Sequence, residues 1–358
     1  MNNMQQHRRA VARRSDGHRH KSANAVATKH RNQPSHTFID LFAGVGGFHL
    51  ALEGLAQCVM ASEWDEQARF TYALNFGEDL SQRQVPFVAD INGVDRQAIP
   101  DHTILCGGFP CQPFSLAGSQ IGFAHEEGNL FFSIAEILHA KRPRVVFLEN
   151  VKNLVSHDSG TTFGVIRKRL DALGYLLKYQ VLDGAEYGNV PQHRERVFLV
   201  AFREQLDHDN FAFPSKIELD RDQLPELIKT CVKQAPEFYL TDSTSRYVMG
   251  MRAIAKRKGV FYRWWRGHAR ENKSGICPTL LTGGGKVPVI LDDYGIRRLT
   301  PRECFAMQGF PSDFVLPALA DCHLYKQAGN SIVVPVVRRV GRKIVEALAK
   351  TDSRGMLG

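Results

Sequence analysis

The amino-acid sequence predicts an α/β protein built on a doubly wound, mostly parallel sheet. From Thr37 onward, short apolar runs alternate with amphipathic stretches, which is the pattern of parallel strands joined by crossover helices. Glycine-rich or acidic segments follow several of the apolar runs, and in such a sheet ligands bind at the carboxyl ends of the strands. We therefore expect the chemistry of this protein to lie in the strand-to-helix loops.

The predicted elements follow one another in a regular order. Strands are expected at 37–41, 57–62, 102–106, 144–149, 176–182 and 196–202. Helices are expected between them at 47–56, 65–75, 129–141 and 160–173. Helical patterning returns at 300–308 and 331–349, so the end of the chain is expected to re-enter the first domain.

Changes in composition divide the chain into predicted parts. Residues 1–36 carry eight Lys or Arg and one Asp, a net charge of +7, and almost no apolar side chains. Such a segment cannot bury enough surface to offset its ordering entropy, so a disordered basic tail is expected. This tail either contacts phosphates without sequence preference or is only a solvated extension. The remaining parts are a main domain at 37–202, a small irregular lobe at 203–296, a C-terminal return at 297–350 and a tail at 351–358.

Composition also excludes several classes of protein. With 358 residues, 43% of them hydrophobic, the chain can bury a sizeable core, but it holds no apolar run long enough to span a bilayer. No secretory signal is visible, so a cytoplasmic location is expected. The cysteines form neither a CxxC pair nor a cluster at zinc spacing, so neither a disulfide framework nor a metal site is expected. They are residues 58, 106, 111, 231, 277, 304 and 322.

Three expected strand ends suit an adenosyl-containing cofactor. The first is a glycine loop within residues 38–48, where the backbone can approach a ligand closely. The second ends in Glu63, which can bind ribose hydroxyls, and Trp64, which can stack on adenine. The third carries Asp90, whose carboxylate can accept from the adenine amino group. These features fit either NAD or S-adenosylmethionine. The residues concerned are Ala43, Gly44, Gly46, Gly47, Glu63, Trp64, Asp90 and Ile91.

Cys111 follows the strand expected at 102–106, in the segment GGFPCQPFS. An unpaired thiol is usually a buried structural side chain. Two glycines and two prolines, however, make a poor core segment and a good rigid loop. We therefore interpret Cys111 as a covalent nucleophile.

Glu149 ends the next strand and is expected at the mouth of the same sheet. A thiolate that adds to C6 of cytosine, while an acid donates to N3, turns C5 into an enamine carbon able to accept a methyl group. The C5 proton must then leave to a base that the sequence does not identify. Glu149 can serve as the acid only if burial raises its pKa. In QHRER at 192–196, Arg194 and Arg196 are candidates to hold the base O2 and a flanking phosphate, unless this segment is only an exposed charged turn.

Taken together, these motifs resemble the bacterial DNA (cytosine-5)-methyltransferases of restriction-modification systems, in the same linear order over residues 37–345. The matching segments are DLFAGVGGF at 40–48, GGFPCQPFS at 107–115, GNLFF at 128–132, ENVKNL at 149–154, QHRERV at 192–197, RRLTPRECFAMQGFP at 297–311 and QAGNSIVVPV at 327–336.

The resemblance implies a cofactor and roles for further residues. The cofactor is S-adenosyl-L-methionine, Cys111 is the nucleophile and Glu149 engages N3 of a flipped cytosine. Phe42 stacks on the adenine, Pro110 and Leu130 line the cofactor pocket, and Asn330 and Ser331 close it. Pro110 and Asn150 join the catalytic group. The lobe at 203–296 becomes the target-recognition domain, and the expected DNA contacts are Gln112, Ser115, Arg263, Arg266, Arg270 and Thr279, the last four of which alternatively contact phosphate or solvent only.

The partners and alternatives follow from the same resemblance. Double-stranded DNA is the expected substrate, a cognate restriction endonuclease the possible functional partner, and the expected state is a monomer near the bacterial nucleoid. One alternative is a tRNA cytosine-5 methyltransferase of the same architecture. The other is a catalytically silent nucleic-acid binder that retains the fold, which an intact Cys111 and Glu149 oppose.

Overall fold

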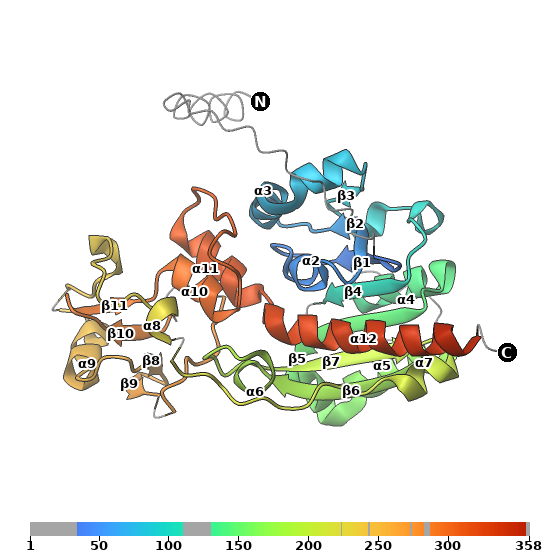
Figure 1. The fold of residues 1–358 in the computed structure, drawn as a ribbon. Helices are drawn as coiled ribbons and strands as arrows, with labels where there is room; N and C mark the ends of the chain where they lie inside the picture. Colours follow the sequence, from blue (N-terminus) through green and yellow to red (C-terminus); the bar gives the residue numbers. More distant parts are fainter. Residues whose placement is uncertain are drawn as a thin grey trace, which may run out of the picture. The chain divides into compact units, whose positions relative to one another are not determined.

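A mostly parallel sheet of seven strands organises the described residues (Figure 1). Its strands occur in the order β3-β2-β1-β4-β5-β7-β6, with β7 antiparallel to both of its neighbours. This arrangement confirms the predicted doubly wound α/β fold. The strands are β1 (Thr37–Leu41), β2 (Gln57–Ser62), β3 (Phe87–Val88), β4 (Ile104–Gly108), β5 (Val145–Val151), β6 (Leu176–Asp183) and β7 (Glu195–Phe202).

The computed structural model describes residues 34–109, 130–222, 224–242, 244–272, 274–282 and 287–355. Residues 1–33, which make up most of the predicted basic tail, lie outside the described residues. The loop that contains Cys111 lies outside them as well. Residues 34–358 form one compact unit. In the part that is described, no helix is long and apolar enough to cross a membrane.

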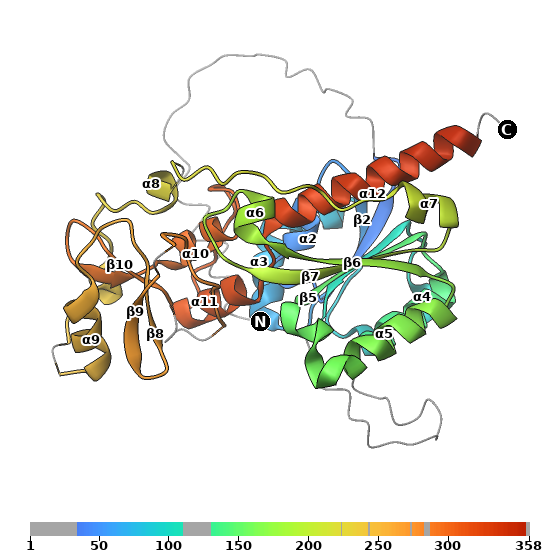
Figure 2. The ribbon, with the colours of Figure 1, turned by 90° about the horizontal axis from the view of Figure 1, so that it is seen from below.

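Helices cover both faces of the sheet, as Figure 2 shows. One face packs against α4 (Leu130–Lys141) and α5 (Thr161–Ala172), and the other against α2 (Gly47–Leu52) and α12 (Val334–Gly355). Successive strand residues alternate between the two cores, because side chains of a strand point to opposite faces. Shorter or peripheral helices are α3 (Glu66–Gln82), α6 (Gly184–Gly188), α7 (Gln205–Asn210), α8 (Leu224–Leu227), α10 (Pro301–Met307) and α11 (Asp321–Asn330).

Helix α12 packs along α2, the first helix in the described part of the chain. Arg338 of α12 donates towards the carbonyl oxygens of Leu50 and Ala51, at the end of α2, over 3.5 and 3.4 Å. Helix α12 continues to Gly355, so residues 351–355 of the expected C-terminal tail are helical. An ion pair of 2.8 Å between Arg144 and Asp352 holds this extension.

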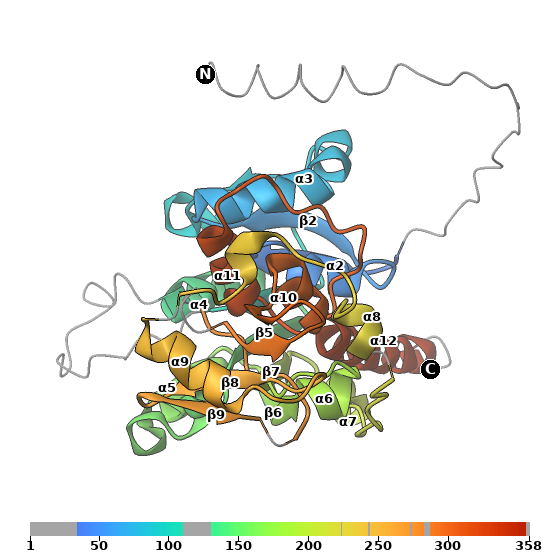
Figure 3. The same ribbon diagram turned by 90° about the vertical axis from the view of Figure 1, so that its left-hand side faces the viewer.

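A second, antiparallel sheet lies in the region that was expected to be irregular. Its strands are β8 (Tyr262–Trp265), β9 (His268–Glu271), β10 (Val289–Leu291) and β11 (Ile296–Arg298), in the order β11-β10-β8-β9. Helix α9 (Arg246–Ile254) packs against β8 and β9 (Figure 3). Strands of three or four residues are too short to show a clear alternation of apolar and polar side chains, which explains why the sequence did not reveal them.

Candidate active site

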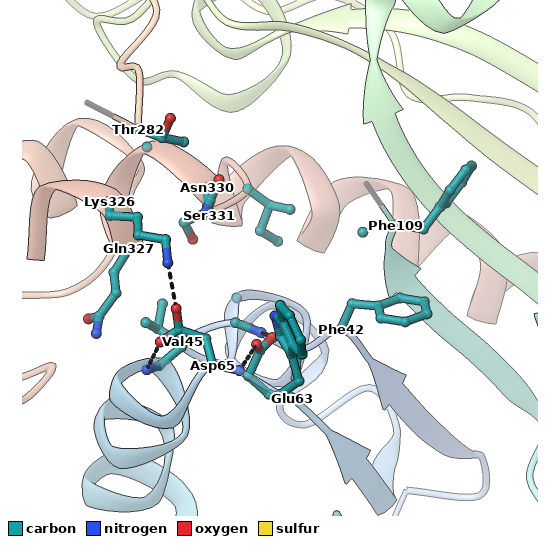
Figure 4. Close-up of a pocket in the computed structure, with 18 of the residues that line it drawn as sticks. Phe42, Val45, Glu63, Asp65, Phe109, Thr282, Lys326, Gln327, Asn330 and Ser331 are labelled. Carbon is teal, nitrogen blue, oxygen red and sulfur yellow. Dashed lines mark hydrogen bonds and ion pairs between the residues drawn. The ribbon is translucent and has the colours of Figure 1, made fainter. Parts of the chain in front are cut away.

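A pocket of about 750 Å³ opens at the carboxyl ends of β1, β2, β4 and β5 (Figure 4). Segments distant in sequence complete it at 280–282 and along α11 to Ile332. Most of the predicted cofactor residues line this pocket, as do four of the predicted catalytic residues. They are Phe42, Ala43, Gly44, Gly47, Glu63, Trp64, Asp90, Ile91, Leu130, Asn330 and Ser331, and Glu149, Asn150, Arg194 and Arg196.

The glycine loop after β1 has a left-handed backbone at three positions. Phe42, Gly44 and Gly46 have φ angles of 55°, 56° and 91°. A Cβ at Gly46 would lie 2.2 Å from a ring carbon of Phe76, so only glycine fits there. Gly46 does not line the pocket itself, but it allows the chain to turn into α2 at the pocket floor.

Glu63 fixes this loop to the end of β2. Its Oε2 accepts from the backbone N–H of Gly44 and its Oε1 from that of Asp65, both over 2.8 Å. Burial raises the pKa of Glu63, and these two backbone donors partly oppose the rise. The neighbouring Trp64 also lines the pocket and leaves 85% of its surface exposed.

Helix α11 forms the opposite wall of the pocket and is tied to α3 by two side-chain contacts. Lys326 reaches Asp65 over 2.6 Å (Figure 4). The Thr71 hydroxyl donates to Gln327 over 2.9 Å. Sequence reasoning missed Lys326 and Gln327 as pocket residues, although Gln327 begins the QAGNSIVVPV segment that was singled out.

Glu149 lies at the inner end of the pocket, where β5 ends, and is buried to 8% exposure. Its Oε1 is 3.0 Å from Nε of Arg196. Burial raises the pKa of Glu149, although the charges of Arg196 and Arg194 act in the opposite direction. Burial therefore favours the protonated form of the Glu149 carboxyl group, whereas the guanidinium beside it favours the carboxylate.

Asn150 positions the chain beside Glu149. Its Nδ2 donates to the Phe109 carbonyl over 2.8 Å, and its Oδ1 accepts from the N–H of Val151. In the parallel register Gly108 is paired with Glu149, so β4 delivers the chain next to this carboxyl group. Four predicted residues beyond Phe109 lie outside the described residues, namely Pro110, Cys111, Gln112 and Ser115.

Arg194 is also buried here, but its guanidinium contacts the backbone. It donates to the carbonyl oxygens of Leu280, Gly329 and Ser331 over 3.1, 2.9 and 2.6 Å. The structure therefore brings Arg194 and Arg196 to the same pocket and gives them different partners.

The β8–β9 hairpin carries three of the predicted DNA contacts. Arg263 and Arg270 are directly opposite each other on its exposed face, and Arg266 lies in its turn with a φ of 49°. The Arg263 guanidinium also lies 5.3 Å from the ring centre of Trp265. Thr279 lies elsewhere, since its hydroxyl donates to the carbonyl of His193 beside the QHRER segment.

Similar solved structures define the class of this fold. DNMT2 of Spodoptera frugiperda, solved as a triple mutant, superposes with a TM-score of 0.65 at 18% identity, covering 87% of this chain and 99% of that chain. S. pombe Dnmt2 methyltransferase gives a TM-score of 0.64 at 19% identity, covering 88% and 99%. The fold is thus that of a methyltransferase with a second, smaller sheet.

Sequence similarity identifies the family. The profile of C-5 cytosine-specific DNA methylase matches residues 36–346. Type II methyltransferase M.Bsp6I of Bacillus sp. (strain RFL6) is 44% identical over 315 residues, covering 86% of this chain and 98% of that protein. Type II methyltransferase M.HhaI of Haemophilus parahaemolyticus is 39% identical over 324 residues, covering 87% and 94%. The chain belongs to the C-5 cytosine-specific DNA methylase family and is an enzyme of that class.

Proposed function

We propose that the pocket binds S-adenosyl-L-methionine and that the enzyme methylates C5 of a flipped-out cytosine through covalent addition of Cys111 at C6. The substrate is a specific short sequence in duplex DNA, and the enzyme is the protective methylase of a restriction-modification system. One observation carries this proposal: a single pocket runs from Glu63 and Trp64 to the buried Glu149–Arg196 pair. A cofactor and a target base bound there would meet inside it.

The residues of the outer pocket fit an adenosyl group. A volume of about 750 Å³ is within the range of small-molecule sites. Glu63 keeps lone pairs for ribose hydroxyls beyond its two backbone bonds, and Phe42 and the exposed Trp64 offer ring faces for adenine. When bound, S-adenosylmethionine supplies an electrophilic methyl group on a sulfonium sulfur.

The inner pocket fits activation of the cytosine ring. In the proposed reaction the Cys111 thiolate forms a bond to C6, while the Glu149 carboxyl gives its proton to N3, so C5 gains the electron pair that attacks the methyl group. Loss of the C5 proton to a base and expulsion of the thiolate from C6, with loss of the proton from N3, then give 5-methylcytosine and the free thiol. Cys111 follows Phe109 by two residues, so covalent geometry keeps the two Cα atoms within about 7 Å. The Asn150–Phe109 hydrogen bond fixes the start of that loop beside Glu149.

Residues 203–296 are the proposed target-recognition domain, which contains the second sheet except for the last two residues of β11. Flipping a base out of the duplex costs a few kcal/mol, which contacts from both parts of the protein must recover. Like charges opposite each other on a hairpin destabilise it. The Arg263–Arg270 pair therefore suits a surface that meets DNA phosphates or base edges, with Arg266 at its tip.

A mechanism-based trap tests the proposed chemistry. Bisulfite sequencing of DNA from cells that express the enzyme would first report the carbon modified and the recognition sequence. With S-adenosylmethionine present, a duplex with 5-fluorocytosine at that position should then form a covalent adduct, because after methyl transfer fluorine cannot leave C5 as a proton does. The adduct would be visible by intact mass and located on Cys111 by peptide mapping. Cys111→Ser should form none, whereas Cys231→Ser, at an exposed cysteine, should react like the wild type.

A lack of adduct with the correct duplex would refute the covalent mechanism. Methyl transfer to tRNA in preference to duplex DNA would favour the RNA-modifying alternative, and retained methylation by Cys111→Ser would exclude this thiol. We further propose that the enzyme acts as a monomer in the cytoplasm, at the nucleoid. Its functional partner would be a cognate restriction endonuclease. The names of the bacterial Type II methyltransferase relatives support its restriction-modification part.

A further inference from the structure

The Arg194 guanidinium joins two segments that lie far apart in the sequence. Its side chain is buried, at 2% exposure, and Nη1 donates to the Leu280 carbonyl over 3.1 Å. Nη2 donates to the carbonyls of Gly329 and Ser331 over 2.9 and 2.6 Å. One cation therefore holds the wall at 329–331, where Ser331 lines the pocket, against residues 280–282 of the recognition region.

Independent contacts show how closely these segments approach. A Cβ at Gly329 would lie 2.5 Å from the Leu281 carbonyl oxygen and 2.8 Å from the Thr282 nitrogen, so the two backbones touch directly. Gln192 reinforces this seam, because its Oε1 accepts from the N–H of Leu280 over 3.2 Å and its Nε2 donates to the Met307 carbonyl over 2.8 Å. We call residues 280–282 together with 329–331 the backbone seam.

Arg194 and Arg196 differ in what their charges contact. Arg196 lies at 3.0 Å from Glu149, whereas both Nη groups of Arg194 are already used by carbonyls of the seam. Burial lowers the pKa of Arg194 to about 9, and the charge of Arg196 adds to this effect while Glu149 opposes it. Burying a cation in this way costs free energy of solvation. The hydrogen bonds to the carbonyls offset this cost only while residues 280–282 and 329–331 stay in contact.

We infer that Arg194 is a positioning residue that sets the cofactor wall at 329–331 through the backbone seam, and that it does not bind the target base. This inference rests on the proposed binding of S-adenosylmethionine in the pocket. Because the same side chain holds Leu280, it also links the cofactor wall to residues 280–282 of the recognition region.

Binding of S-adenosylhomocysteine without DNA provides the test, measured by isothermal titration calorimetry. Arg194→Lys retains a charge but cannot present two nitrogen groups to three carbonyls, so its Kd should rise about tenfold or more, equivalent to about 1.4 kcal/mol. Arg196→Lys should leave this Kd within about twofold of wild type and instead lower kcat on long unmethylated phage DNA. Arg167→Lys, at an exposed position of α5, is the matched control and should change neither quantity.

Thermal unfolding of each variant checks that it is folded. If Arg194→Lys does not fold, Gly329→Ala tests the same seam with Arg194 intact, since its Cβ must displace Leu281 and should raise the Kd by a similar factor. An unchanged Kd in folded Arg194→Lys, with kcat alone reduced, would overturn the positioning role and return Arg194 to base binding. Failure of the wild type to bind S-adenosylhomocysteine would instead refute the proposed cofactor.

Discussion

Replacing Arg297 by Met should destabilise the second sheet more than any surface substitution. Arg297 is fully buried, at 0% exposure, where β11 ends before α10. Its Nε donates to Asp292 over 2.7 Å, and its Nη atoms donate to both oxygens of Glu303 over 2.8 Å. Burial opposes this charge, but the bonds to Glu303 and Asp292 outweigh it and raise the pKa of Arg297.

The magnitude follows from what the substitution leaves behind. Methionine fills most of the volume but leaves two buried carboxylates without their cation, although Asp292 keeps bonds from the Tyr239 hydroxyl and the N–H groups of Tyr294 and Gly295. Breaking a buried ion pair by removing one partner costs about 3–5 kcal/mol. That is a large part of the about 5–15 kcal/mol by which a domain is usually stable.

Urea unfolding followed by tryptophan fluorescence measures this loss. Two of the three tryptophans, Trp264 and Trp265, lie on β8 of the second sheet and report its unfolding. With a slope of about 3 kcal/mol/M, the midpoint should fall by about 1–2 M. Arg246→Met, at an exposed position of α9, is the control and should stay within about 0.5 kcal/mol. An Arg297→Met protein as stable as this control would refute the reasoning.

Three further predictions concern pH and backbone strain. Arg196→Met removes a positive charge that lowers the pKa of Glu149, so this pKa should rise in the variant. The loss of kcat at alkaline pH should therefore move to higher pH. If the alkaline side of the kcat profile stays where it is in the wild type, Glu149 is not the acid. Burial raises the pKa of Asp40 to about 8 in the folded state. Between about pH 4 and pH 8 the unfolded state therefore loses this proton before the folded state does, and the free energy of unfolding falls as pH rises. Asp40→Asn should unfold at a higher urea concentration than the wild type, by a margin that grows over this range. Gly46→Ala should lower the free energy of unfolding, measured in urea, by more than about 2 kcal/mol. Its Cβ would lie 2.2 Å from a ring carbon of Phe76 in α3, and the φ angle at this position is +91°. Gly54→Ala, with a φ of +77° and open space around the Cβ, is its control and should cost only the backbone strain of about 1 kcal/mol, so equal losses would contradict the steric argument.

The central strands of the main sheet were predictable because they are buried on both faces. The run expected at 144–149 is β5 at Val145–Val151, where every residue but the last is buried. Such continuous apolar runs are distinctive in a parallel sheet. The same argument fails for β3, which has two residues, and for the strands of the second sheet, which are too short to show a period.

The part of the site around Glu63 and the glycine loop was predictable for a different reason. Glu63 and the glycine loop are local features, in which each side chain acts near its own strand end. The contacts of Arg194 are not local, because its carbonyl partners lie 86, 135 and 137 residues further along the chain. Periodicity and spacing give no information on which backbone carbonyls such a side chain will meet.

The contact between the last helix and the first has a consequence for synthesis on the ribosome. A helix leaves its final carbonyls without partners inside the helix. In α2 the guanidinium of Arg338 satisfies those of Leu50 and Ala51, across 288 and 287 residues of sequence. A nascent chain therefore carries an unfinished β1–α2 unit until Arg338 has emerged, and translation that stops before residue 329 leaves a fragment with neither this cap nor the pocket wall at 329–331.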